Sequence, residues 1–155
     1  MVDALLANAR HGAAPAVWIE GARVAPSVIT RAGLVEEGRR IAAGLRGVGV
    51  QPGDRILLGL PTGADFVHAF CGALLCGAVP VPLEAPLSKL QRETFRVRST
   101  QLAHALGARL VIEDVAAGGD EPLERDGGTS AYADGALTRY TLAAIRRVPP
   151  IAADD

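Results

Sequence analysis

The residues that could carry out chemistry are spread along this chain and do not form a known catalytic pattern. The histidines His11, His68 and His104 lie far apart, and none has a second histidine, a cysteine or a carboxylate at the spacing of a metal site. The serines lack the Gly-x-Ser-x-Gly turn that exposes a nucleophilic hydroxyl. The sequence therefore predicts no catalytic residue and no metal ligand, and it favours a structural role for His68, with its hydrogen bonds satisfied.

The two cysteines, Cys71 and Cys76, are five residues apart in an apolar segment. On a helix this spacing points the two side chains to different faces. We therefore expect two reduced thiols in the core, in preference to a disulfide or a metal-binding pair.

The best-placed turn for binding an anion covers residues 60–65, between an apolar run and the expected start of a helix. Backbone N–H groups bind phosphate at such turns, but this one contains one glycine and no lysine. Thr62 and Asp65 have the spacing of a capping box, so helix capping is the favoured role. The acidic pairs Glu36-Glu37 and Glu113-Asp114 are expected on a solvated face and at a strand end.

The composition indicates one globular domain. The chain has 155 residues, of which 49% are hydrophobic and 21% charged, with a formal net charge of -1. Scattered basic residues and an aromatic content of 4% argue against nucleic-acid binding. No run approaches the roughly 18 apolar residues of a membrane span, and Asp3 interrupts any signal peptide. A cytoplasmic location is the expectation.

Hydrophobic periodicity predicts the elements that must position any site. Residues 16–24 fit a β-hairpin with its turn at Glu20-Gly21. Thr30 suits the N-cap of a helix that ends before the glycines and proline of residues 47–53. The apolar run 55–60 fits a buried strand, followed by a helix that starts between Thr62 and Asp65 and stops at Gly77.

A second cycle follows the first. Residues 78–83 fit a short strand whose two prolines favour the edge of a sheet. Residues 90–106 fit a helix and residues 109–112 a third strand. Strand, helix, strand, helix, strand predicts a Rossmann-like α/β fold, a mainly parallel sheet flanked by helices, with a small N-terminal β-hairpin.

The same patterns divide the chain into four parts. Residues 1–14 are expected to be a flexible N-terminus and residues 15–115 an α/β subdomain. Residues 116–141 are turn-rich or flexible, and residues 142–155 read as the start of a next element or a linker.

Three stretches in this order and spacing resemble the start of the adenylate-forming, or AMP-forming, acyl and aminoacyl ligase superfamily. They are Gly38–Leu45 leading into Gly49–Ile56, then Leu60–Val67, and then Cys76–Leu83. The resemblance covers roughly residues 15–115. Within this superfamily, the sequence of residues 61–66 and 69–72 is most similar to that of the fatty-acyl-AMP ligase branch.

The resemblance implies a parent enzyme that joins a carboxylate to ATP, with Mg²⁺, and passes the acyl group to a carrier-protein or coenzyme A thiol. The phosphate loop and the lysine-bearing lid of the family lie downstream of the matched region, and residues 149–155 resemble the approach to that loop. No catalytic residue carries over, and we expect no cofactor to be bound by this chain alone. Pro61, Thr62 and Pro82 are the predicted nearest edge of the acyl or aminoacyl pocket.

The leading hypothesis is therefore an N-terminal ligase fragment, inactive alone, with adenylation-domain relatives in polyketide or nonribosomal biosynthesis. Its partners would be the remainder of the ligase and the thiol acceptor, with self-association through an exposed subdomain face. One alternative is a free-standing, non-catalytic docking module on a ligase-like scaffold. Another is an α/β protein for a small ligand whose likeness to the ligases is accidental.

Overall fold

The computed structural model describes residues 2–21, 24–86, 88–114, 124–125, 129–134 and 137–149. Its helices are α1 (Val2–Asn8), the 3-10 turn η1 (Ala9–His11), α2 (Arg31–Gly47), α3 (Ala64–Cys76), α4 (Lys89–Leu106) and α5 (Leu142–Arg147). Its strands are β1 (Pro15–Gly21), β2 (Val24–Thr30), β3 (Arg55–Gly59), β4 (Val79–Pro82), β5 (Ala108–Glu113), β6 (Glu124–Arg125), β7 (Thr129–Asp134) and β8 (Leu137–Thr141).

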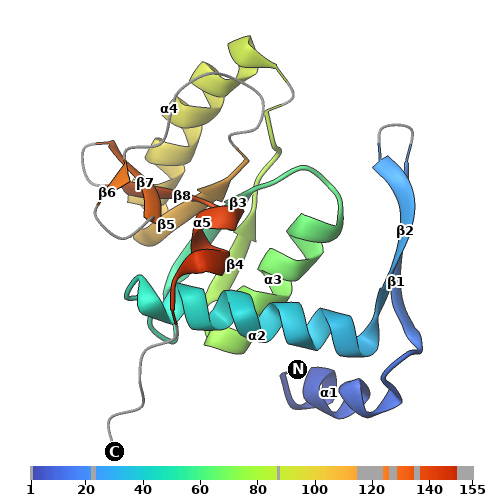
Figure 1. Cartoon of the computed structure of the whole chain (residues 1–155). Coiled ribbons are helices and arrows are strands. Elements are labelled where there is room, and N and C mark those ends of the chain that lie inside the picture. The colour runs from blue at the N-terminus through green and yellow to red at the C-terminus, as the bar shows by residue number, and fades with distance from the viewer. Residues whose placement is uncertain are drawn as a thin grey trace, which may run out of the picture.

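The strands form two sheets (Figure 1). The antiparallel pair β1–β2 stands at the end of α2, away from the larger sheet, whose strand order is β4-β3-β5-β8-β7-β6. Strand β3 pairs in parallel with β4 and β5, and β8 pairs in parallel with β5, whereas β7 and β6 are antiparallel additions. The predicted α/β fold with a parallel sheet is confirmed, and β4 lies at the edge as its prolines suggest.

Helices cover both faces of the parallel strands. Ile56 and Leu58 belong to the core shared with α2, α3 and α5, whereas Leu57, which points to the opposite face, packs in the cluster that includes Ala103 of α4. Successive side chains of a strand alternate between faces, so this division follows from the strand geometry. The βαβαβ unit is therefore doubly wound, and the carboxyl ends of β3, β4 and β5 meet at one edge.

Helix α2 forms as its sequence predicts. Thr30 is its N-cap, and the hydroxyl oxygen of Thr30 accepts a hydrogen bond from the N–H of Gly33 at 3.1 Å. The positions spaced by three and four residues are all buried: Leu34, Gly38, Ile41, Ala42 and Leu45.

Helix α3 starts and stops where expected, but its predicted cap is wrong. It begins at Ala64, between Thr62 and Asp65, and ends at Gly77, whose φ of 84° is the left-handed conformation that glycine favours. The N-cap residue is Gly63, and no side chain caps the helix. Asp65 is paired with Arg146 of α5 instead, at 2.9 Å.

Two expectations for the N-terminal region need correction. The hairpin turn does not lie at Glu20-Gly21, because both residues belong to β1 and Gly21 pairs with Val24. Residues 2–11, expected to be flexible, form α1 and η1. The guanidinium of Arg31 donates to Oδ1 of Asn8 at 3.0 Å, which ties this segment to the start of α2.

The segment 116–141, expected to be turn-rich or flexible, contains part of the sheet. Residues 116–123, 126–128 and 135–136 lie outside the described part of the chain, but β8 is a fourth parallel strand whose Leu137 is buried. Residues 142–147 form α5, capped by the hydroxyl of Thr141, which accepts from the N–H of Ala144 at 3.0 Å. The end of the expected linker, residues 150–155, is not described.

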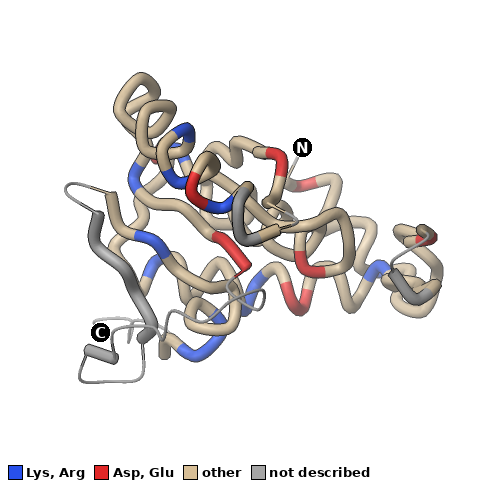
Figure 2. Tube along the Cα trace, turned by 90° about the horizontal axis from the view of Figure 1, so that it is seen from above, with Lys and Arg blue, Asp and Glu red and all other residues tan. Residues whose placement is uncertain are grey.

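Figure 2 shows acidic and basic residues interspersed along the described chain, in line with the near-neutral net charge. Every helix within the described ranges is too short or too polar to cross a membrane.

Candidate functional site

The structure brings the three predicted pocket-edge residues to one edge of the sheet. Pro61 and Thr62 directly follow β3, and Pro82 is the last residue of β4. Strands β3 and β4 are parallel neighbours in which Leu58 pairs with Pro82, so both loops leave the sheet on the same side. All three residues are exposed. Their assignment to a substrate pocket stays a prediction.

A cavity of about 790 Å³ begins next to this edge, between the loop after β4 and helix α4. Leu83, Glu84, Ala85 and Pro86 form one wall and residues of α4 form the other. The N–H of Leu83 donates to the carbonyl oxygen of Leu58 at 2.9 Å, which holds the loop onto β3. The cavity volume is in the range of small-molecule sites, and Pro61, Thr62 and Pro82 are not among its lining residues.

Phe95 of α4 connects the cavity to the sheet. This ring is buried, lines the cavity and lies directly over Gly59, the last residue of β3. A Cβ atom at Gly59 would overlap the Phe95 ring, so only glycine permits this approach. The α4 wall is therefore seated on the carboxyl end of the central strand.

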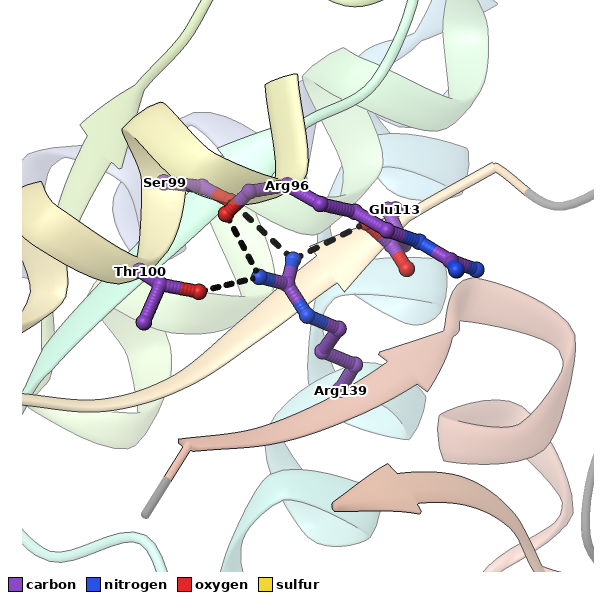
Figure 3. Close-up of polar contacts among 5 residues, drawn as sticks. All are labelled: Arg96, Ser99, Thr100, Glu113 and Arg139. Atoms are coloured by element: carbon purple, nitrogen blue, oxygen red, sulfur yellow. Dashed lines mark hydrogen bonds and ion pairs between the residues drawn. The ribbon is translucent and has the colours of Figure 1, made fainter. Parts of the chain in front are cut away.

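A buried arginine of β8 fixes the same helix from below (Figure 3). Arg139 is 1% exposed, and its Nη1 donates to Oγ of Ser99 at 3.0 Å and to Oε2 of Glu113 at 3.2 Å. Its Nη2 donates to the carbonyl oxygen of Arg96 at 3.1 Å and to Oγ1 of Thr100 at 2.8 Å. Because Ser99 also lines the cavity, Arg139 connects β8 and β5 to the cavity wall.

The sequence missed this network. Glu113 was expected at a strand end, and it does end β5, but it is 6% exposed and neutralised by Arg139. The sequence does not predict the burial of Arg139, because β8 is short and polar and lacks the alternating apolar residues of a half-buried strand. The Nε of Arg139 has no partner among the described residues.

A second charged cluster joins three helices on the opposite face of the sheet. Arg146 of α5 donates through Nε to Oε2 of Glu37 on α2 at 3.2 Å and through Nη2 to Oδ1 of Asp65 on α3 at 2.9 Å. His68, one turn after Asp65, is half-buried. Burial, and then the charge of Arg146, lower the pKa of His68, while Glu37 and Asp65 act against this shift.

The expectation that His68 is fully hydrogen-bonded is wrong within the described chain, because its buried Nδ1 has no partner there. The cysteines agree with their prediction: both are buried and free, and they belong to different core clusters. Burial raises the pKa of the Cys71 thiol to about 11, so this thiol stays protonated at neutral pH. In the parts of the chain that the structure describes, no three His, Cys, Asp or Glu residues are grouped as metal ligands.

Comparison with known proteins gives one matching family model, described as "AMP-binding enzyme", over residues 6–139. Pyochelin synthetase PchE of Pseudomonas aeruginosa is 48% identical over 56 residues, which are 36% of this chain and 4% of the synthetase. Salicyl-AMP ligase / salicyl-S-ArCP synthetase of Mycobacterium tuberculosis is 35% identical over 116 residues, 72% of this chain and 19% of the ligase.

A solved structure of McyG A-PCP complexed with phenylalanyl-adenylate has the same fold, with a TM-score of 0.73 at 16% identity. The similarity covers 99% of this chain and 27% of the McyG chain. The chain thus spans a minor part of each of these proteins.

Proposed function

Because this chain belongs to the AMP-binding enzyme family, we propose that it supplies the N-terminal α/β subdomain of an AMP-forming ligase. The observation that carries the proposal is the family match, which extends over the whole βαβαβ unit and into β8. Such a ligase joins a carboxylate to the α-phosphate of ATP, releases pyrophosphate, and transfers the acyl group to a thiol of a carrier protein or of coenzyme A.

ATP and Mg²⁺ are the cofactors of that reaction, and the described residues at the carboxyl ends of β3 and β5 do not fit them. Residues 60–63 include one glycine and no lysine or arginine. Strand β5 ends at the acidic Glu113 and is followed by Asp114, and the nearby guanidinium of Arg139 is bound to Glu113. A triphosphate needs positioned cations and N–H donors. We therefore assign no step of nucleotide chemistry to these residues and propose that the chain alone forms no acyl adenylate.

The part we do assign to this chain is the near edge of the acyl or aminoacyl pocket, at Pro61, Thr62 and Pro82. Open α/β sheets bind ligands outside the carboxyl ends of their strands, next to the strand where the order reverses. Here β3 is that strand, since β4 and β5 lie on its two sides. The adjoining cavity supports the proposal because its loop wall continues directly from Pro82.

Three classes of carboxylic acid are candidate substrates of the parent ligase: fatty acids, aryl acids and amino acids. Residues 61–66 and 69–72 resemble fatty-acyl-AMP ligases, whereas a relative that covers most of this chain is a salicyl-AMP ligase. Amino acids form the third class, because a phenylalanyl-adenylate is bound in a structure of the same fold.

The test is isotope exchange between pyrophosphate and ATP by the purified chain, with Mg²⁺ and one fatty acid, aryl acid or amino acid at a time. We expect no exchange above the protein-free background with any acid, while a complete AMP-forming ligase assayed in parallel exchanges with its own substrate. Exchange that a change such as Thr62→Val abolishes would show that the chain carries the chemistry itself, and the proposal would fail.

A further inference from the structure

The cluster around Arg146 has no part in the proposed function, and it links α5 to two other helices. Asp65 and His68 are three residues apart on α3, so their side chains share one face of that helix. Arg146 is bonded to Asp65 and therefore lies over this face, and its second bond reaches Glu37 of α2. One guanidinium thus fastens α5 to both neighbouring helices.

His68 sits under this bridge in an unfavourable setting for a positive charge. It is half-buried, and its Nδ1 is buried and lacks a partner among the described residues. The charged groups that act on the ring are Glu37 from α2, Asp65 from α3 and Arg146 from α5. Burial and Arg146 together outweigh the two carboxylates, so the ring is neutral while α5 is docked at neutral pH.

We propose that His68 and Arg146 form a pH-sensitive latch, in which protonation of the imidazole opens the contact of α5 with α2 and α3. A protonated ring places a second positive charge beside Arg146. It also offers a competing donor to the carboxylates of Glu37 and Asp65, which Arg146 now occupies. When α5 opens, Nδ1 gains water as a hydrogen-bond partner and the ring loses the neighbouring guanidinium.

The direction of the effect follows from linkage. The pKa of His68 is lower in the docked form than in the open form, so the open form binds more protons as the pH falls. Docking of α5 is most stable well above pH about 6.5, the pKa of a free histidine, and becomes less stable as the pH falls below it. Each unit of difference between the two pKa values changes the docked-to-open ratio by at most about tenfold.

The open form is a minor population at any of these pH values, because α5 is well packed. Leu142 and Ile145 are buried, and Gly44 of α2 lets the backbone of Ile145 approach so closely that a Cβ there would overlap its carbonyl oxygen. The latch therefore changes how often α5 opens, and amide hydrogen exchange measures such openings directly.

The experiment is hydrogen exchange of the whole chain at pH 7.5, 6.5 and 5.5, with each rate divided by its intrinsic rate at that pH. We expect opening of residues 142–147 to become severalfold more frequent from pH 7.5 to 5.5, while residues 110–113 of β5 keep their protection. The variant His68→Gln should remove the pH dependence. The matched control His104→Gln changes an exposed histidine of α4 and should behave like the unmodified chain.

A pH-independent opening of α5, an equal change in β5, or a pH dependence that persists in His68→Gln would each overturn the latch. A second measurement does not depend on that variant folding. Titration of the His68 ring by NMR should give a pKa below the ordinary histidine value of 6.5, and Arg146→Gln should raise the pKa of His68. An unchanged pKa in Arg146→Gln would also contradict the proposal.

Discussion

Arg139 shows at the residue scale how a charge is accommodated inside this sheet. Its guanidinium is enclosed by β5, β8 and α4, where an unpaired charge is strongly unfavourable. Its Nη1 and Nη2 donate four hydrogen bonds, to Glu113, Ser99, Thr100 and the Arg96 carbonyl oxygen. Because three of these acceptors belong to α4, the arginine sets where the helix, and with it the wall of the cavity, lies on the sheet.

Arg139→Met is expected to lower the free energy of unfolding by about 3–5 kcal/mol, because it leaves the Glu113 carboxylate buried without its partner. The double variant Arg139→Met/Glu113→Leu should lose less than the single one, since an apolar pair leaves no buried charge. Chemical denaturation of both variants measures this.

Arg109→Met is the matched control for that experiment, because Arg109 is exposed and we expect a change of no more than about 0.5 kcal/mol. A double variant as unstable as Arg139→Met would show that the Arg139–Glu113 pair is not the reason for the loss.

Single residues also show where sequence reasoning stops. The start of α3 was predicted correctly from Thr62 and Asp65, but the predicted cap was not formed, because Asp65 binds an arginine 81 residues further along the chain. Glu113 was placed at the end of its strand, and its burial depends on Arg139. Both errors have one cause: the partner of a charged side chain is set by tertiary structure, which local spacing does not contain.

At the scale of elements, α2 is packed through glycines that let its neighbours approach. Gly38 faces Cys71 and Leu75 of α3, and Gly44 faces the Ile145 backbone of α5. A side chain at either position would have to displace these neighbours. Gly47 is a third such position, because a Cβ there would overlap the side chain of Val148. The helix therefore combines an ordinary apolar face with glycine positions where a larger residue does not fit.

Gly44→Ala is expected to destabilise the chain by about 1–3 kcal/mol, because the added methyl group overlaps the Ile145 carbonyl and the overlap outweighs the better helix propensity of alanine. Gly21→Ala provides the comparison, since a Cβ at Gly21 meets no atom within 4 Å. Thermal or chemical unfolding distinguishes the two. Equal stability of Gly44→Ala and Gly21→Ala would contradict the close packing of α5 on α2.

The elements with strong periodicity could be predicted, and those without it could not. α2, β3, α3, β4, α4 and β5 follow apolar runs or three-and-four spacing with clear stop residues, so local physics determines them. β8 was missed because its buried positions are Leu137 and an arginine, so it lacks the apolar run of a buried strand. The hairpin turn was misplaced because Glu20-Gly21 is a turn-like pair within a longer strand.

At the scale of the whole molecule, the parallel sheet presents the carboxyl ends of β3, β4 and β5 on one side. That edge carries the predicted pocket residues and a cavity, whose lining includes the acidic Glu84 and the exposed, basic Arg98. The nearby buried Arg139 is paired with Glu113. The chain therefore has the α/β platform of its family, and the residues that directly follow β3, numbers 60–63, include no cation to hold the phosphates of a nucleotide. The resemblance of three short stretches predicted the family. It did not predict which residues line the cavity, because residues that are far apart in the sequence come together there only in the folded chain.

Equilibrium binding of ATP with Mg²⁺ to the purified chain tests this account most directly. Isothermal titration or equilibrium dialysis should show no saturable binding at millimolar nucleotide, at low and at physiological salt. Saturable binding of one ATP per chain, removed by a single substitution within the described residues, would contradict the account.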